Sequence, residues 1–326
     1  MIEILEIKKI KYKLKKIDIL AIVGPTATGK TRLAIELAKK LDGEIINADS
    51  MQVYKELNIG TAKPSKSELG NVAYHLIDII NKDQDFNLSE YVNLAKEKIL
   101  DIKSRNKLAI LTGGTGLYVD SVVNNINLDI IPQDLDLRKK LSKEYDEFGE
   151  EYIRQKLYKL DKNSALKIQK NNKKRLIRAL EINYLTSKTL DQVFLETKKN
   201  QDFYKSIWIG LNYKDRKLLY NKIDNRVDDM INSGLINEAR LLFNNNLKTT
   251  SIQAIGYKEF YEYFQKKESL EYVIQKIKQN TRKYAKRQIS WFGKNNKINW
   301  INIDECENFE ELISFCLKLL EKINLS

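Results

Sequence analysis

The sequence predicts an α/β fold, in which a P-loop NTPase-like parallel sheet has helices on both faces and carries an all-helical insertion. Three observations predict it. Short apolar runs alternate with amphipathic helical patterns up to residue 114. Each of these apolar runs ends in a polar or glycine-rich cluster, as parallel strands do where a ligand binds at their carboxyl ends. Helical periodicity without a strand pattern then fills residues 128–198.

The first strand is expected at residues 17–24, with the sequence IDILAIVG. It leads into GPTATGKT, the G-x-x-x-x-G-K-T spacing of a phosphate-binding loop, and a helical pattern follows at 31–41. In such a loop, backbone amides and the helix N-terminus bind phosphates, Lys30 adds a charge and Thr31 is placed to bind Mg²⁺. A nucleoside triphosphate is the default ligand, although any diphosphate fits the motif. The residues expected to bind the diphosphate or nucleotide are Gly24, Pro25, Thr26, Ala27, Thr28, Gly29, Lys30 and Thr31.

The second strand is expected at residues 44–50, and Asp49 lies near its end, beside the phosphate loop. A carboxylate in that position either holds Mg²⁺ through water or accepts a proton from a nucleophile. The competing interpretation is an aspartate that only caps a helix or turn. Spacing alone does not separate the two interpretations.

A helix at 88–104, with Ser89 as its expected cap, precedes the third strand at 107–114. The cluster TGGTGLY follows at 112–118, where glycines allow the backbone to approach a ligand closely and Thr115 offers a hydroxyl. A tight turn between strand and helix explains the same residues, and from the spacing we favour that interpretation.

The chain changes character after Pro132. Helical patterns cover 135–148, 150–160, 163–169 and 171–188, and strand character returns only at 205–213. We therefore divide the chain into a core of residues 1–127 and 199–326 and a helical insertion of residues 128–198. Further helices are expected at 216–234, 236–243 and 271–292, and a short last strand at 297–303.

Composition restricts the class of protein. The net charge of +13 favours a polyanionic partner, although a chain rich in Lys, Ile and Asn also follows from genome base composition. Two cysteines ten residues apart and a single histidine do not support a zinc site. No apolar run of 18 residues and no secretory signal are present. We expect a reduced, cytoplasmic protein with no membrane partner, and a monomer.

Two further features have structural as well as functional interpretations. In NTRKYAKRQISWF, at 280–292, cations alternate with aromatic rings, as suits RNA. A solvated helix face over a buried aromatic stripe is the usual explanation of such a pattern, and for this segment alone it is the preferred interpretation. His75 is expected to be a hydrogen-bonded interior residue rather than a base or ligand.

Taken in order, these clusters resemble one family, the tRNA dimethylallyltransferases, also called tRNA isopentenyltransferases, in their bacterial type. DSMQVY followed by IGTAKP is far more specific than the phosphate loop, and the matching motifs span nearly the whole chain. They are GPTATGKT, ADSMQVYKELNIGTAKPS, HLID, LTGGTGLYV, RLIRALEI, GYKE and TRKYAKRQISWF.

The resemblance implies transfer of a dimethylallyl group from dimethylallyl diphosphate to the exocyclic amine of the adenosine 3′ of the tRNA anticodon, position 37. The phosphate loop would then hold a prenyl diphosphate, and Mg²⁺ is the expected cofactor, with Thr31 as its ligand. The resemblance assigns the proton-accepting role to Asp49, a diphosphate contact to Thr26 and a second cation to Arg226. It implies tRNA contacts, made through the anticodon stem-loop, for Asp49, Ser50, Met51, Gln52, Thr115, Arg138, Lys174, Arg175, Leu176, Ile177 and Arg178.

The sequence departs from the family pattern in three places. Lys222 stands where the family usually has arginine, Tyr74 stands where it often has a histidine, and residues 1–16 form an N-terminal extension. The basic extension is an RNA-binding arm, a disordered tail or the product of a misassigned start codon. Three alternatives to tRNA prenylation remain: a small-molecule kinase or NTPase, an RNA-binding protein with a vestigial phosphate loop, and a prenyltransferase of free adenine nucleotides.

Overall fold

The structure is a computed structural model that describes residues 2–198, 204–244 and 250–323. The chain forms two compact units, one made of residues 1–123 and 203–326 and the other of residues 124–202. The second unit differs from the predicted insertion by four residues at each end.

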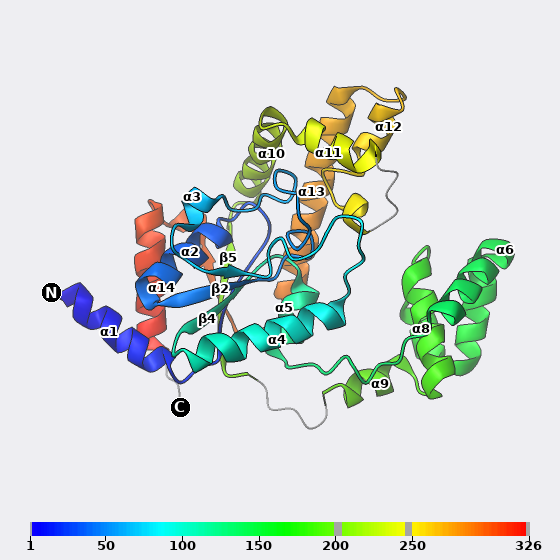
Figure 1. The fold of residues 1–326 in the computed structure, drawn as a ribbon, viewed down its shortest axis with the longest axis horizontal. Coiled ribbons are helices and arrows are strands. Elements are labelled where there is room, and N and C mark those ends of the chain that lie inside the picture. Colours follow the sequence, from blue (N-terminus) through cyan, green and yellow to red (C-terminus); the bar gives the residue numbers. More distant parts are fainter. Residues whose placement is uncertain (1, 199–203, 245–249, 324–326) are drawn as a thin grey trace. The chain divides into compact units, whose positions relative to one another are not determined.

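The first unit is built on a six-stranded sheet in which every pair of neighbours is parallel, in the order β3-β2-β4-β1-β5-β6 (Figure 1). The predicted α/β fold is confirmed. Because all strands run the same way, their carboxyl ends meet at one edge, where the phosphate loop, Asp49 and the glycine cluster follow β1, β2 and β4. The strands are β1 (Ile19–Val23), β2 (Gly43–Asn47), β3 (Tyr74–His75), β4 (Leu108–Thr112), β5 (Ser206–Asn212) and β6 (Ile298–Asn302).

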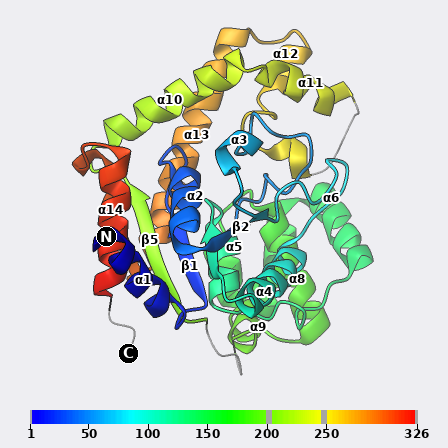
Figure 2. The ribbon, with the colours of Figure 1, turned by 60° about the vertical axis from the view of Figure 1, so that its left-hand side comes forward.

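Helices cover both faces of this sheet. The helices of the first unit are α1 (Ile2–Leu14), α2 (Lys30–Leu41), α3 (Lys66–Leu69), α4 (Leu88–Ser104), α5 (Gly116–Val123), α10 (Arg216–Asn232), α11 (Leu235–Asn244), α12 (Phe260–Phe264), α13 (Leu270–Phe292) and α14 (Phe309–Lys322). On one face, α2 packs on the strands and α14 packs on α2 and α1; α1 and α14 lie side by side in Figures 1 and 2. On the other face, α4 packs on β2 and β4, and α5 packs against both α4 and α13.

The second unit is all-helical, as predicted. Its core comes from apolar side chains of α6 and α8, with Leu141, Ile153, Leu157 and Leu180 fully buried. Gly149 has a φ of 85° and interrupts α6 between the two predicted helical segments. The helices of this unit are α6 (Leu135–Leu160), α7 (Lys162–Lys167), α8 (Lys173–Thr186) and α9 (Leu190–Glu196).

Several elements differ from the sequence-based expectations, among them helices α1 and α12, which were not expected. The cap of α4 is Asn87, whose side chain accepts the amide of Glu90 at 3.0 Å, so the assignment to Ser89 was wrong. The two-residue strand β3 was missed because two residues give no readable alternation. Helix α14 was also missed, although Leu312, Ile313, Cys316 and Leu320 repeat at helical spacing and are buried.

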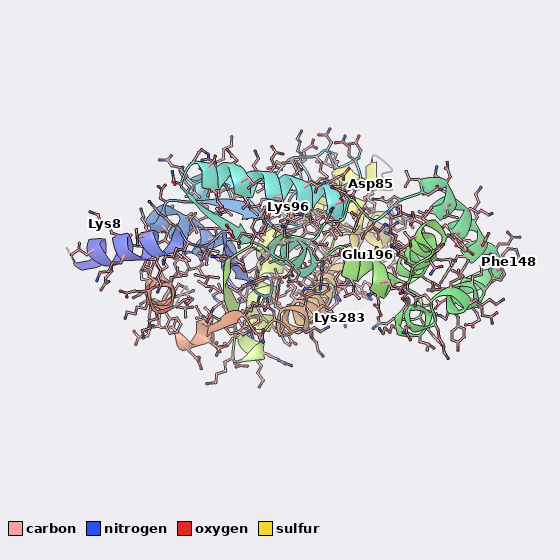
Figure 3. All side chains as sticks on the ribbon, turned by 90° about the horizontal axis from the view of Figure 1, so that it is seen from below. Lys8, Asp85, Lys96, Phe148, Glu196 and Lys283 are labelled. Atoms are coloured by element: carbon pink, nitrogen blue, oxygen red, sulfur yellow. The ribbon has the colours of Figure 1, made fainter. Side chains whose placement is uncertain are left out.

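The N-terminal extension is folded onto the first unit. Residues 2–14 form α1, and Ile10, Leu14 and Ile17 are buried in the core shared with α2 and α14. This packing excludes the disordered-tail interpretation for residues 5–17. Lys8, labelled in Figure 3, is exposed on α1.

Candidate functional site

The phosphate loop has the backbone that its sequence requires. A Cβ on Gly24, whose φ is 140°, would lie 2.2 Å from the carbonyl oxygen of Leu211, so only glycine fits beside β5. Gly29 has a φ of 74° and is the N-cap of α2, which begins at Lys30. The Thr28 hydroxyl and the Lys30 ammonium both donate to the carbonyl oxygen of Pro25, at 2.8 and 2.6 Å. The loop therefore presents the free amides of a helix N-terminus to an anion.

Lys30, Thr31, Asp49 and Arg226 line one cavity of about 870 Å³, together with Thr26, Ala27 and Gly29 of the loop. Burial, and then the neighbouring charge of Arg226, lower the pKa of Lys30 from 10.5 to about 7. Burial also lowers the pKa of Arg226, while the carboxylate of Asp49 opposes this shift. Two desolvated cations thus lie near the carboxylate of Asp49, and an anionic ligand would stabilise the charged forms of both.

Asp49 is positioned by the turn that follows β2. Its amide donates to the side-chain oxygen of Asn47 at 3.2 Å, and its carboxylate accepts the amide of Met51 at 2.9 Å. Asn47 is itself held by a bond to the carbonyl oxygen of Leu76 at 3.0 Å. One carboxylate oxygen therefore orients the side chain, which leaves the other for a ligand in the cavity that Asp49 lines.

The glycine cluster after β4 packs against the same turn. A Cβ on Gly113 would lie 2.2 Å from the carbonyl oxygen of Ala48, so glycine lets the two backbones touch. The Thr115 hydroxyl accepts the amide of Ser50 at 3.1 Å and lies 3.3 Å from its hydroxyl. Thr115 and Ser50, both expected to contact tRNA, are therefore neighbours.

Gln52 is placed differently from its neighbours. Its side chain is buried and donates to the carbonyl oxygens of Thr61 and Ala62, at 3.0 and 3.3 Å. It lines the cavity while it holds the segment IGTAKP, whose residues 60–64 form another part of the wall.

Glu238 anchors that same segment, and sequence reasoning missed it. The buried carboxylate accepts the amides of three consecutive residues, Asn58, Ile59 and Gly60, at 2.8 to 2.9 Å, and the hydroxyl of Tyr257 at 2.7 Å. Gly60 has no room for a Cβ, which would lie 2.6 Å from the Tyr257 ring. In the sequence, Glu238 is an ordinary charged residue of the expected helix at 236–243, and no motif marks it.

Helix α13 contributes the segment rich in cations and rings. Its inner face carries Tyr284 and Gln288, while Lys283, labelled in Figure 3, is exposed. Arg282 forms an ion pair with Asp224 of α10 at 2.5 Å. The segment is thus partly a packed stripe, and Tyr284, Arg287 and Gln288 line the cavity.

In the second unit, the residues expected to contact tRNA divide into buried and exposed groups. Arg138 and Arg178 both form ion pairs with the buried carboxylate of Glu181, at 3.0 and 2.8 Å. Leu176 and Ile177 are interior residues, so their side chains are not available to a ligand. Lys174 and Arg175 are exposed at the start of α8.

His75, the single histidine of the sequence, lies in β3. The His75 ring is hydrogen-bonded to the carboxylate of Glu44 at 2.8 Å, as expected, but its side chain is 23% exposed and therefore half-buried rather than interior. In the described parts of the chain, no three His, Cys, Asp or Glu side chains gather as a metal site. None of the helices in those parts is both long and apolar enough to cross a bilayer.

The sequence is similar to one family model and to several known proteins with the same name. The sequence model of the IPP transferase family matches residues 52–295. A tRNA dimethylallyltransferase of Caldanaerobacter subterraneus subsp. tengcongensis is 45% identical over 300 residues, covering 91% of this chain and 95% of that protein. One of Acetivibrio thermocellus is 43% identical over 298 residues, covering 91% and 95%.

Two solved structures are also similar to most of this chain. The tRNA isopentenylpyrophosphate transferase of Bacillus halodurans has a TM-score of 0.69 at 40% identity, covering 93% of this chain and 95% of that chain. A eukaryotic dimethylallyltransferase described as acting on tRNA has a TM-score of 0.73 at 30% identity, covering 87% and 73%.

Proposed function

Because this chain belongs to the IPP transferase family, we propose that it is a tRNA dimethylallyltransferase, an enzyme that prenylates tRNA. It transfers the dimethylallyl group of dimethylallyl diphosphate to the exocyclic amine of adenosine 37, immediately 3′ of the anticodon, and releases diphosphate. The observation that carries the proposal is one cavity lined by the phosphate loop, by two cations, and by Asp49 with the residues 50–52 that follow it.

The phosphate loop side of the cavity suits the departure of diphosphate. An allylic carbon–oxygen bond breaks readily when the negative charge that develops on the leaving group is neutralised. Lys30, Arg226 and the amides at the start of α2 supply that neutralisation in a desolvated site, where it is strongest. Thr26 is the further diphosphate contact.

Asp49 is the group that accepts the proton. The exocyclic amine of adenine is a weak nucleophile because its lone pair is delocalised into the ring, so it must lose a proton as the new carbon–nitrogen bond forms. Asp49 is oriented through one oxygen by the Met51 amide and lies in the same cavity as the cations. The other oxygen is then directed to the amine.

Mg²⁺ fits the residues at this site. Thr31 lines the cavity, and a magnesium ion bound to phosphates needs only one or two protein oxygens. When bound, the ion would further neutralise the diphosphate. The protein would hold it through Thr31.

The helical unit is the part that binds the anticodon stem-loop. Lys174 and Arg175 are exposed cations at the N-terminus of α8, where they suit phosphates, and Arg138 and Arg178 are pre-oriented by Glu181. The adenosine then enters the cavity from a single-stranded loop, where unstacking costs little. We place this monomeric enzyme in the cytoplasm, with its tRNA substrate.

The test is an assay with radiolabelled dimethylallyl diphosphate and two anticodon-loop substrates, one with adenosine and one with guanosine at position 37. We expect label in the adenosine substrate alone, and a mass increase of one C5H8 unit. Transfer of phosphate from ATP, with no transfer of prenyl groups, would instead identify a kinase. Equal labelling of free adenine nucleotides would identify a nucleotide prenyltransferase.

A further inference from the structure

One buried amide side chain connects the two loops of the cavity. Gln288 lies on the inner face of α13 and is 4% exposed. Its Oε1 accepts the backbone N–H of Thr26 at 2.8 Å, and its Nε2 donates to the carbonyl oxygen of Gly114 at 2.8 Å. Thr26 belongs to the phosphate loop, and Gly114 precedes Thr115 in the glycine cluster.

The partners fix the orientation of this amide. A backbone N–H only donates and a carbonyl oxygen only accepts, so Gln288 must present oxygen to Thr26 and nitrogen to Gly114. Neither a carboxylate nor an apolar side chain satisfies both. Burial makes the requirement stringent, because an unmatched polar group there costs a full desolvation penalty.

The local backbone is adapted to this side chain. A Cβ on Gly114 would lie 2.1 Å from Nε2 of Gln288, so the glycine makes room for the amide. Tyr284, one helical turn earlier, approaches the same carbonyl oxygen at 3.5 Å. The contact is therefore a built junction between α13 and the carboxyl ends of β1 and β4.

We propose that Gln288 is a positioning residue, which fixes the distance between the diphosphate loop and the loop that orients the acceptor nucleoside. This inference rests on the proposed function. Transfer requires the leaving group, the allylic carbon and the amine to be aligned, and a misplacement of about 1 Å is enough to cost roughly a hundredfold in rate. Gln288 touches neither the reacting atoms nor the diphosphate in this role.

The first experiment compares Gln288→Ala with Gln279→Ala, a matched control at an exposed site on the same helix. We expect Gln288→Ala to lower kcat by at least tenfold, while the Kd for tRNA stays within about threefold of the wild-type value. Gln279→Ala should leave kcat, Kd and thermal midpoint unchanged. A kcat for Gln288→Ala within twofold of the wild-type value would overturn the proposal.

The second variant, Gln288→Glu, separates positioning from general destabilisation. Its carboxylate still accepts from Thr26 but turns an oxygen toward the carbonyl of Gly114, and protonation restores a donor there. We expect its kcat relative to the wild type to rise as pH falls from 8 to 5.5. The proposal would be overturned if the ratio of the Gln288→Glu kcat to the wild-type kcat did not change with pH while the variant kept the wild-type thermal midpoint.

The two hypotheses fail in different ways. If the wild-type protein does not transfer prenyl groups, the proposed function is wrong. If the wild-type protein transfers them and Gln288→Ala does so equally well, only the positioning role is wrong.

Discussion

Arg226 and Lys30 line the same cavity. Burial lowers the pKa of Lys30 to about 7, and the positive charge of Arg226 contributes a smaller part of that shift. The two cations lie on segments almost 200 positions apart, α2 and α10. Holding like charges together is unfavourable in the ligand-free protein, and the attraction of both cations to a bound diphosphate would offset that repulsion. Their proximity is therefore explained by the ligand.

The first prediction concerns the affinity for inorganic diphosphate. A charge-assisted hydrogen bond contributes about 1.5–3 kcal/mol, or roughly 10- to 150-fold in Kd. We expect Arg226→Ala to weaken binding near the lower end of this range, because removing Arg226 lets the pKa of Lys30 rise and partly compensates. Isothermal titration calorimetry measures the effect. Arg216→Ala, at an exposed site on the same helix, is the control, and equal affinities for the two variants would contradict the assignment.

The second prediction concerns Asp49 as the proton acceptor. Asp49→Asn keeps a side-chain oxygen for the Met51 amide, so the turn is retained, but the amide cannot take a proton. We expect kcat to fall by roughly 10²–10⁴-fold with tRNA affinity retained. Single-turnover transfer and filter binding test this. Asp83→Asn, at an exposed site, should behave as the wild type, and a fully active Asp49→Asn would refute the role.

The third prediction concerns the anchor of the segment IGTAKP. Glu238→Ala leaves three neighbouring amides and the Tyr257 hydroxyl without their acceptor. We expect the stability of this region to fall by about 3 kcal/mol, with faster hydrogen exchange at residues 58–60. Exchange monitored by mass spectrometry measures this. Glu262→Ala, exposed on α12, is the control, and unchanged protection at 58–60 in Glu238→Ala would contradict the anchoring role.

The features that were predictable from the sequence are those written in contiguous residues. The strands and the phosphate loop follow from local apolar runs and from GPTATGKT, because strand, turn and helix are adjacent there. β3 was too short to read, and α14 was simply overlooked. The role of Arg226 came from the family resemblance, since an arginine within a helix rich in charges carries no local signal.

Long-range polar contacts were not predictable. Glu238 lies 178 to 180 positions from its amide partners, and Gln288 lies 262 positions from Thr26. In the sequence, each is an ordinary polar residue of an amphipathic helix, which usually faces solvent. Their partners become visible only in the folded chain, where Gln288 of α13 contacts the loops after β1 and β4, and Glu238 of α11 contacts residues 58–60.

The last prediction concerns the acid stability of the cluster around Glu44, at the start of β2. This buried carboxylate accepts from the Arg105 guanidinium, and also from Lys107 and His75 at 2.9 and 2.8 Å. The hydrogen bond from Arg105 holds the pKa of Glu44 well below its usual value of 4.5, although burial opposes the shift. A carboxylate with a depressed folded-state pKa stabilises the protein above the unfolded-state pKa, and the contribution is lost as pH falls through the folded-state value.

We therefore expect Glu44→Gln to lower the thermal midpoint most between pH 5 and 7, because there the wild-type carboxylate is charged in both the folded and the unfolded state. Below about pH 4.5 the difference between the two proteins should shrink, since protonation of the unfolded wild-type chain removes the advantage of its ion pairs. Thermal melts monitored by circular dichroism from pH 3 to 7 measure this. Glu97→Gln, exposed on α4, should follow the wild type at every pH. A constant difference between wild type and Glu44→Gln across that range would show that Glu44 contributes through packing alone, and not through its charge.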